Sequence, residues 1–203
     1  MKTKILLPLL AAAFGCAALP AAHAEDNWVV RFGAHVVDPK SDNGTLAGMK
    51  AHINNDTKPS ASLEYMFNPN VGLDVLAALP FKHDVKLNGQ KAASTKHLPP
   101  TIGVNYHFMP EAQISPFVGV GVNYTHFFDE KGRGILKGAK VQIDDSWGVA
   151  AHAGLDFKLS DKWLITADVR WIDIESDVKV GGAKVGKAKV DPWVYGLSFG
   201  YRF

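Results

Sequence analysis

The chain has 203 residues, 47% of them hydrophobic, and a mean hydropathy near zero, which predicts one folded domain and argues against disorder. Its 22 basic and 20 acidic side chains nearly balance, so the charge gives no support to nucleic-acid binding. A single cysteine, Cys16, excludes a disulfide within one chain.

The first 24 residues have the pattern of a secretory signal peptide. Two lysines precede an apolar run, and the small-x-small site at 22–24 stands ahead of two acidic residues. The alternative is a lipoprotein signal cut before Cys16, because Gly15 precedes that cysteine. Cleavage after residue 24 leaves a domain, 25–203, with 20 basic and 20 acidic side chains and without a thiol nucleophile.

Eight segments of this domain alternate bulky apolar residues with small or polar ones. That period of two predicts β-strands, and no apolar stretch after residue 24 reaches the roughly 18 residues of a membrane-spanning helix. In chain order the segments are 28–37, 59–67, 71–81, 98–108, 118–125, 147–158, 163–171 and 193–203.

The links between these strands alternate in length. Short links span 68–70, 109–113 and 160–162, and long polar links span 39–58, 83–96, 129–146 and 175–189. In outer-membrane barrels, short turns face the periplasm and long loops face the exterior. The sequence therefore predicts an all-β fold, an eight-stranded antiparallel transmembrane β-barrel in the bacterial outer membrane, with short periplasmic turns and long extracellular loops.

The placement of aromatic residues favours this barrel over a secreted β-sandwich, whose strands would alternate in the same way. If both termini lie on the periplasmic side, one group of aromatic residues falls at each end of a band of Val, Leu, Ile and Ala. Aromatic rings at these two heights would lie in the two headgroup layers of the membrane. The periplasmic group is Trp28, Phe67, Phe108, Phe157, Trp163 and Phe203, and the outer group is Phe81, Tyr124, Phe128, Trp147, Trp171 and Trp193.

The last strand, 193–203, has one large apolar face and ends on Phe203. We expect it to pair with the first strand, so that no edge stays open in hydrocarbon. Its aromatic end resembles the C-terminal signal that hands barrel proteins to the outer-membrane assembly machinery, which we therefore expect as a partner.

Several longer stretches go beyond general barrel patterns. They are "VDPKSDN" (37–43), "NVGLDVLAALPFKHDV" (70–85), "HLPPT" (97–101), "VGVGVNYTHFFDE" (118–130), "DSWGVAAHAGLDF" (145–157), "WIDIE" (171–175) and "DPWVYGLSFGYRF" (191–203). In this order they resemble the OmpW family of small outer-membrane barrels, across nearly all of the domain. The resemblance implies a monomeric eight-stranded barrel with a narrow, largely apolar lumen that passes small hydrophobic molecules inward, as in the AlkL-type alkane-uptake proteins of the same group.

The side chains expected to face the lumen are charged near the periplasmic end. Three basic and three acidic groups must pair in so narrow a space, which predicts a plug of salt bridges and not a catalytic set. The expected plug residues are Arg31, Glu64, Asp74, Asp156, Lys158 and Arg202, with His107 nearby.

Higher in the lumen the inward side chains are mostly apolar. The expected pocket consists of Val37, Leu76, Ala78, Pro80, Phe127, Arg170, Ile172 and Ile174. Arg170 stands where OmpW-like sequences often place an inward aromatic that faces the position of Leu76. Its guanidinium would narrow the apolar floor, pair with Asp168 or Asp156, or anchor a carboxylate-bearing solute.

A plug below an apolar pocket would deny a solute an axial exit, so the exit would be sideways. Prolines cannot donate ladder hydrogen bonds, and a group of them lies at or near the outer strand ends. The candidates for a lateral opening are Pro80, Pro99, Pro100 and Pro192. An alternative interpretation of equal weight is that these prolines only mark strand ends and bends.

Catalysis and metal binding have little support in the sequence. His83, His97 and His126 lie near the expected outer rim, with Ser94 and Ser146 in loops, but no His-x-Ser pair or metal-ligand spacing connects them. We expect isolated polar loop residues, no enzymatic activity, no cofactor and no metal.

The outer loops carry many basic residues, which would attract the phosphates of lipopolysaccharide or simply form a solvated surface. They are Lys50, Lys58, Lys91, Lys96, Lys131, Arg133, Lys137, Lys140, Lys184, Lys187 and Lys189. The leading hypothesis is a passive facilitator that admits small hydrophobic or amphipathic molecules and releases them laterally. The alternative is a plugged structural or interaction barrel, such as an adhesin, a phage or bacteriocin receptor or a stress-related surface protein, that transports nothing.

Overall fold

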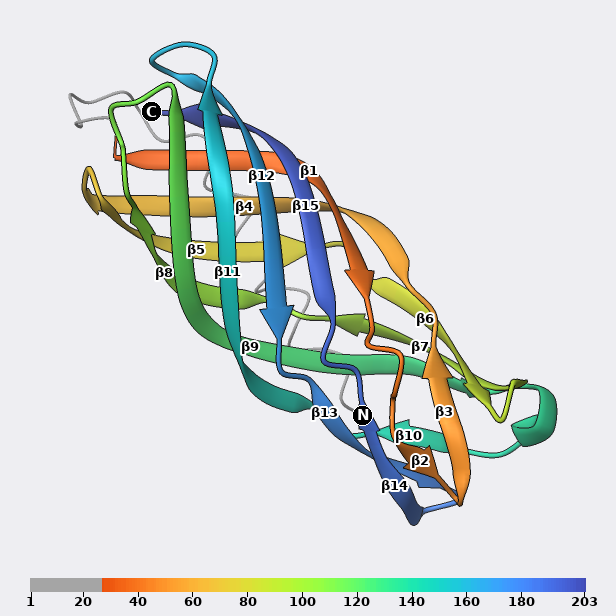
Figure 1. Ribbon diagram of the computed structural model, residues 1–203. Helices are drawn as coiled ribbons and strands as arrows, with labels where there is room; N and C mark the ends of the chain where they lie inside the picture. The colour runs from red at the N-terminus through yellow and green to blue at the C-terminus, as the bar shows by residue number, and fades with distance from the viewer. Residues whose placement is uncertain (1–26) are drawn as a thin grey trace.

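The computed structural model describes residues 27–203, and the expected signal peptide lies outside these residues. Eight antiparallel strands form a ring that closes because the last strand, β15, pairs with the first, β1 (Figure 1). In ring order they are β1 (Trp28–Asp38), β4 (Asp56–Asn68), β5 (Val71–Ala78), β8 (Thr101–His107), β9 (Ile114–Gly132), β11 (Ser146–Lys158), β12 (Trp163–Ile172) and β15 (Trp193–Arg202). The predicted eight-stranded antiparallel barrel is confirmed.

The barrel has its apolar face outside and its polar face inside. In β9, Val118, Val120 and Val122 are exposed, whereas Asn123 and Thr125 are completely buried. A water-soluble barrel would show the opposite arrangement, and an outer surface this rich in exposed valine and aromatic rings needs an apolar environment.

The two ends of the barrel differ. At one end, which we call the turn end, strands are joined by the short segments 69–70, 108–113 and 159–162. The ring also closes here, where the backbone N–H of Trp28 donates to the carbonyl of Phe203 at 3.0 Å and that of Phe203 donates back at 2.9 Å. Both ends of the described chain therefore lie beside one another at the turn end.

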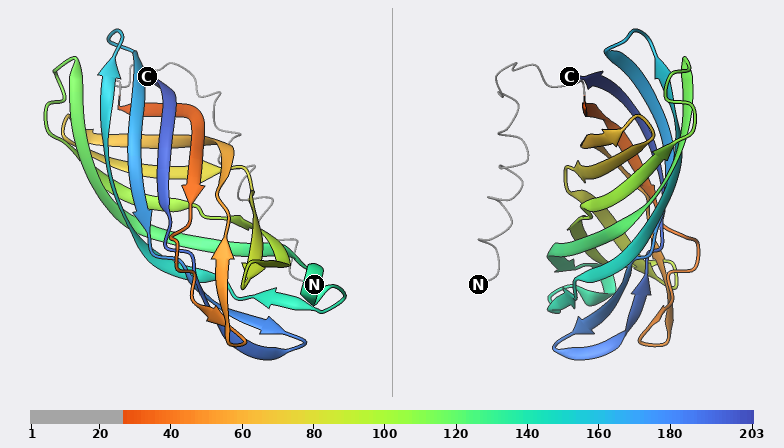
Figure 2. Two further views of the ribbon diagram at one scale, coloured as in Figure 1. Left: turned by 45° about the vertical axis from the view of Figure 1, so that its right-hand side comes forward. Right: turned by 90° about the vertical axis from the view of Figure 1, so that its left-hand side faces the viewer.

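The long links at the other end are not irregular loops, because they continue the wall as further strands (Figure 2). These elements are β2 (Thr45–Leu46), β3 (Met49–Ile53), β6 (Phe81–Leu87), β7 (Gln90–Leu98), β10 (Val141–Ile143), β13 (Glu175–Val180) and β14 (Ala183–Lys189), with a short 3-10 helix, η1 (Gly134–Leu136). Together with residues 126–132 of β9 we call them the extension. They pair in the order β10-β13-β14-β2-β3-β6-β7-β9.

Pro80 separates β5 from β6 and reverses the side-chain alternation between them. In β5 the odd-numbered Val75 faces outward, but in β6 the odd-numbered Phe81 is only 2% exposed and packs inside with Phe127. Proline has no N–H to continue a ladder, so the strand ends and restarts in the other phase. The expectation that Phe81 belongs to the outer aromatic group is therefore wrong.

The apolar core lies inside the outer half of the barrel and inside the extension. One buried cluster joins Val37 of β1, Phe127 of the extension and Ile174, which lies between β12 and β13, and a second joins Leu46, Leu87 and other residues of the extension. Within residues 27–203 no helix is long and apolar enough to cross a membrane.

Candidate functional site

A network of charged side chains fills the lumen towards the turn end, and Arg31 of β1 is its lower centre. The Arg31 guanidinium donates to Glu64 Oε2 at 2.8 Å, to Asp156 Oδ2 at 3.1 Å and to Thr166 Oγ1 at 2.9 Å. Thr166 in turn donates to Asp156 Oδ1 at 2.5 Å. Four strands thus contribute one group each, and two carboxylates pair with the single positive charge of the arginine.

Further polar side chains complete the bonding of Glu64, which is fully buried. Asn105 Nδ2 donates to Glu64 Oε1 at 2.7 Å, and His107 Nε2 lies 3.0 Å from the same oxygen. Asn105 also meets His152, whose Nε2 lies 2.6 Å from Asn105 Oδ1. A buried carboxylate needs such partners, because an unpaired ion in a confined space is strongly destabilising.

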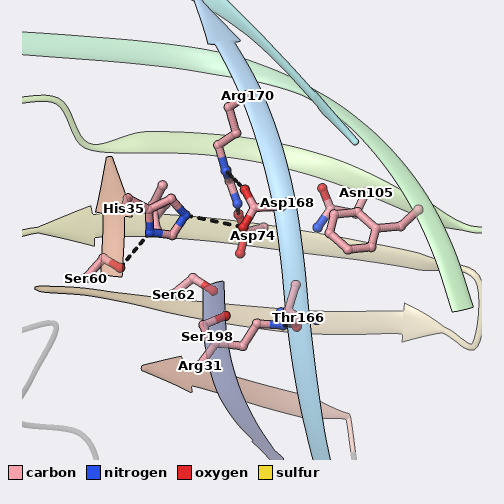
Figure 3. Close-up of a pocket in the computed structure, with 12 residues that line it drawn as sticks. Arg31, His35, Ser60, Ser62, Asp74, Asn105, Thr166, Asp168, Arg170 and Ser198 are labelled. Atoms are coloured by element: carbon pink, nitrogen blue, oxygen red, sulfur yellow. Dashed lines mark hydrogen bonds and ion pairs between the residues drawn. The ribbon is translucent and has the colours of Figure 1, made fainter. Parts of the chain in front are cut away.

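Arg170 of β12 is the centre of an upper layer (Figure 3). Its Nε donates to Asp168 Oδ2 at 2.9 Å, and both Nη atoms lie 3.3 Å from Asp74 Oδ2. His35 Nε2 lies 3.3 Å from Asp168 Oδ1, and His35 Nδ1 lies 2.6 Å from Ser60 Oγ. We call the side chains of both layers the plug. They are Arg31, His35, Ser60, Glu64, Asp74, Asn105, His107, His152, Asp156, Thr166, Asp168 and Arg170.

The structure brings together four residues expected in the plug, namely Arg31, Glu64, Asp74 and Asp156. Lys158 lies outside the network and donates to the backbone carbonyl of Pro110. Arg202 is half-buried and forms no ion pair within the described chain. Arg170 was expected in the apolar pocket, but its two carboxylate partners make it part of the plug.

The plug leaves almost no free space. A cavity within it measures about 10 Å³ and is bordered by Arg31, His35, Leu76, Arg170 and neighbouring groups. A site needs roughly 10–15 Å³ to hold a single water molecule. Solutes larger than water therefore have no axial path through the lumen in this conformation.

Glycines on neighbouring strands make room for the plug, because each is the register partner of plug residues. A Cβ at Gly196 would overlap His35 Nε2 and Asp168 Oδ1, and a Cβ at Gly119 would overlap Asn105 Oδ1. The small residues that alternate with the outer aromatics are thus the residues that let large polar side chains cross the lumen.

The contacts among Ser60, His35 and Asp168 connect the same three residue types as a serine hydrolase triad. The adjoining cavity of about 10 Å³ cannot admit an acyl group. Within residues 27–203, no three His, Cys, Asp or Glu side chains are placed to hold a metal ion.

Above the plug, the extension encloses an apolar cavity of about 120 Å³. Every long link contributes to its wall, so the cavity exists only when all of them are assembled. Its lining includes Leu46, Met49, Ala51, Ile53, His83, Val85, Leu87, Ala92, Ala93, His97, Phe127, Leu136, Val141, Ile143, Val178, Val180, Val185, Ala188 and Val190.

The cavity lies further from the plug than the sequence predicts. Of the residues expected to line a pocket, only Phe127 borders it; Val37, Ile172 and Ile174 form the buried apolar cluster with Phe127, and Ala78 packs against that cluster. Leu76 borders the small cavity of the plug instead, and Pro80 borders neither.

The cavity wall comes largely from segments that were expected to be polar loops. A period of two was present there, since Phe81, His83, Val85 and Leu87 alternate with Lys82, Asp84 and Lys86. Lysines between the apolar residues lower the mean hydropathy and conceal this pattern. An alternation test applied to the links would have found it.

Two of the expected rim histidines are part of this wall. His83 and His97 are each only 1% exposed, so the expectation that they are isolated loop residues is wrong. Burial lowers the pKa of His83, and it lowers that of His97 further, so both rings are neutral at neutral pH. His126 differs, because it lies at the surface and pairs with Asp145 at 2.9 Å.

The barrel wall is interrupted beside the cavity. The β5–β8 ladder ends at the pair Leu76 and Thr101, and pairing resumes between β6 and β7 at Phe81 and His97. Residues 77–80 and 98–100 lie between these pairs and have no register partners across the break among the described strands.

The four prolines do not behave alike. Pro80, Pro99 and Pro100 lie within this interruption, and the carbonyls of Pro99 and Pro100 accept hydrogen bonds from Asn123 on the β9 side. At Pro192 the wall is continuous, because its carbonyl accepts from the Ile172 N–H at 3.3 Å.

Many of the basic residues of the outer links are paired with neighbouring carboxylates. Lys91 meets Asp84 at 3.0 Å, and Lys131 meets Asp129 at 2.6 Å. Further pairs join Lys96 to Asp129, Lys179 to Asp144, Lys184 to Asp177, and both Lys187 and Lys189 to Glu175. Exposed pairs add little stability, but they offset much of the positive charge expected to attract phosphates.

A closed antiparallel ring with an apolar exterior, a polar interior and short turns at one end defines an integral β-barrel of the outer-membrane type. The OmpW family model matches residues 24–203, and the chain belongs to the OmpW family. Outer membrane protein W of Vibrio cholerae is 38% identical over 197 residues, which cover 90% of this chain and 91% of that protein.

More distant relatives and solved structures agree. Outer membrane protein AlkL of Ectopseudomonas oleovorans is 29% identical over 200 residues, covering 90% of this chain and 85% of that protein. The crystal structure of OprG from Pseudomonas aeruginosa has a TM-score of 0.76 at 35% identity, covering 87% of this chain and 95% of that one. The protein is thus an outer-membrane barrel among lipid and lipopolysaccharide, with its turn end in the periplasm and its extension outside the cell.

Proposed function

We propose that this protein is a passive, non-enzymatic facilitator that takes small hydrophobic or amphipathic molecules from outside the cell into the apolar cavity of the extension. The single observation that carries this proposal is the cavity of about 120 Å³ built from every extracellular link above a sealed plug. A cavity of about 150 Å³ lined by aliphatic side chains binds benzene, which sets the scale of the solute. The family resemblance led to the same expectation of hydrophobic solutes.

Lateral release follows from the sealed plug and the interrupted wall. A solute in the cavity has no room to continue along the axis, where the free volume is about 10 Å³. Phe81 and His97 stand at the upper edge of the interruption, and His97 also lines the cavity. Separation of β6 from β7 next to this interruption would widen the gap between residues 77–80 and 98–100, which no ladder hydrogen bonds close, and would join the cavity to the bilayer.

The proposal is tested by measuring uptake of a fluorescent apolar solute into lipid vesicles that hold the refolded barrel, with ionic conductance recorded on the same preparation. We expect faster uptake than in protein-free vesicles and little conductance. The Val185→Trp variant fills the cavity and should lower uptake several-fold, whereas Lys184→Trp, on the outer face of the same strand, should not. Equal uptake by both variants would contradict a route through the cavity.

Lateral release is tested separately with a disulfide. Lys82 and Lys96 are register partners just above the interruption, and such partners lie within disulfide range. A Lys82→Cys/Lys96→Cys barrel, refolded without residues 1–24, has no other cysteine. Oxidation should slow uptake and reduction should restore it, while a Glu175→Cys/Lys189→Cys cross-link on the opposite hairpin should have no effect.

An interaction barrel remains the second candidate, because the sealed plug and the ion-paired outer surface would suit it equally. Absence of both uptake and conductance from a barrel shown to be folded would favour it. We also propose that the assembly machinery recognises the end of the chain through Phe203.

A further inference from the structure

The outer face of the β6–β7 hairpin carries lysines in facing positions (Figure 1). Lys82 of β6 is the register partner of Lys96 of β7, and nearer the hairpin turn Lys86 is the partner of Lys91. The residues that alternate with the lysines of β6, such as His83, are buried, so the lysines point outward. Like charges directly opposite one another destabilise a pair of strands, so this arrangement favours a partner of opposite charge.

Carboxylates of the protein do not supply all of that charge. The carboxylates that pair with lysines on this side of the extension are Asp56 with Lys58 at 2.8 Å, Asp84 with Lys91 at 3.0 Å, and Asp129 with both Lys96 at 3.2 Å and Lys131 at 2.6 Å. Within residues 27–203, the side chains of Lys82 and Lys86 form no ion pair. In the β13–β14 hairpin, by contrast, every lysine has a carboxylate partner.

The facing pair lies at the height of the outer aromatic group. Lys96 is also the register partner of Phe128 on β9, a half-buried ring on the outer face that stacks on His126 at 5.9 Å. Aromatic rings of this kind mark the headgroup layer of a membrane. Lys82 and Lys96 therefore lie where the outer leaflet presents the phosphates of lipopolysaccharide, which attract basic side chains.

We propose that Lys82 and Lys96 form a binding site for a phosphate group of lipid A, the phosphorylated glycolipid part of lipopolysaccharide, at the upper edge of the wall interruption. The Cβ atoms of directly opposed residues are about 5 Å apart, so one phosphate can accept hydrogen bonds from both ammonium groups. Its negative charge removes the repulsion between them. Acyl chains of the same molecule would lie against the outer wall below, where Leu79 is 51% exposed.

Lipid A with and without its phosphates tests the site. The full refolded barrel in neutral maltoside micelles would be titrated with bisphosphorylated lipid A and with the same lipid after removal of both phosphates. A chelator keeps divalent cations from bridging phosphates to carboxylates, and native mass spectrometry measures the bound lipid. The phosphorylated form should bind about tenfold more tightly, on the scale of one charge-assisted hydrogen bond.

Variants separate this site from the general positive charge of the outer surface. Lys82→Gln/Lys96→Gln should bring the two affinities close together, whereas Lys82→Arg/Lys96→Arg should keep the preference, because a guanidinium also binds phosphate. The matched control is Lys137→Gln/Lys140→Gln. It removes two exposed lysines between η1 and β10 that form no ion pair within residues 27–203, and it should keep the preference.

Equal binding of both lipids to the native barrel, or an unchanged preference in Lys82→Gln/Lys96→Gln, would overturn the site. An equal loss of preference in both glutamine variants would overturn it too, because net charge alone would then explain binding. So would phosphatidylglycerol binding as tightly as lipid A. A preference that only Lys82→Gln/Lys96→Gln abolishes supports the site, and none of these results bears on the uptake of apolar solutes.

Discussion

Arg31 shows how one residue can hold the lumen closed. Its guanidinium meets Glu64 and Asp156 in a space where both carboxylates are buried. Well-packed apolar side chains could stabilise the barrel as well as such a network does. Removing one partner from the network, however, leaves the others charged and unpaired. The plug is therefore easy to damage by single substitutions.

Arg31→Ala should lower the free energy of unfolding by about 3–5 kcal/mol, because two buried carboxylates lose their shared cation. Equilibrium unfolding in urea, followed by tryptophan fluorescence in lipid vesicles, measures this change. Arg202→Ala is the matched control, since Arg202 forms no ion pair within residues 27–203 and should change stability by less than about 0.5 kcal/mol. Similar losses in the two variants would contradict the energetic role of the plug.

Arg170→Ala should make the lumen leak cations. The substitution removes the side chain beside the small plug cavity and leaves Asp74 and Asp168 without their arginine. Single-channel recording in planar bilayers should show a conductance above that of the native barrel, with a reversal potential that favours cations in a salt gradient. Native-like conductance would place the constriction elsewhere.

At the scale of elements, β6 and β7 carry buried histidines into the extracellular half. Burial lowers their pKa values, and near His83 the charges of Asp56 and Lys58 act in opposite directions. The unfolded hairpin takes up protons as the pH falls below the ordinary value of 6.5, whereas the folded hairpin does not. The extension therefore has its full stability above that pH and loses stability below it.

Hydrogen exchange should reveal this loss locally. Between pH of about 6.5 and 5, protection of β6 and β7 amides, corrected for intrinsic exchange, should fall by up to about 1.4 kcal/mol per histidine and pH unit. The His97→Phe substitution should remove a large part of this change in protection with pH. Amides of β11 and β12 within the barrel serve as the internal reference, and an equal loss of protection in them would point to global opening instead.

At the scale of the whole molecule, closure of the ring involves the last residue. The backbone of Phe203 exchanges two hydrogen bonds with Trp28, so the ring closes whatever the side chain at position 203. The aromatic ring of Phe203 stacks on Tyr201 at 6.2 Å and is partly exposed. Its side chain is thus free to serve recognition, and its backbone serves the fold.

Phe203→Ala separates these two roles. In cells the variant should reach the outer membrane in several-fold lower amounts, measured as the folded, heat-modifiable fraction on gels. Refolding into detergent, where no assembly machinery acts, should be close to native because both closing hydrogen bonds remain. An equal loss in both settings would show that the ring supports the fold and not its recognition.

Much of the barrel could be predicted from the sequence, because each strand's alternation is local. Val118, Val120 and Val122 mark the outer face of β9 without any knowledge of its partners. The order and closure of the strands also follow, since short and long links leave an antiparallel ring as the simple solution. The phase change at Pro80 was missed, because alternation extended through a proline gives the wrong face for Phe81.

The site was harder to predict, because its contacts join residues far apart in the chain. Arg170 bonds to Asp74 across 96 positions, and Arg31 bonds to Thr166 across 135. Sequence alone identified inward-facing charges but could not choose the partners or place Lys158 and Arg202 outside the network. Neither could it show that polar links assemble around an apolar cavity.

By itself, the sequence determined the class of fold, the lipid-facing surface and the family, because these depend on periodicity and on motifs that are read along one strand at a time. The tertiary structure decided which charges form the plug, where the wall is interrupted and that His83 and His97 share one cavity. The physical reason is that pairing register and the closing of the ring set distances between strands, and no local pattern contains those distances.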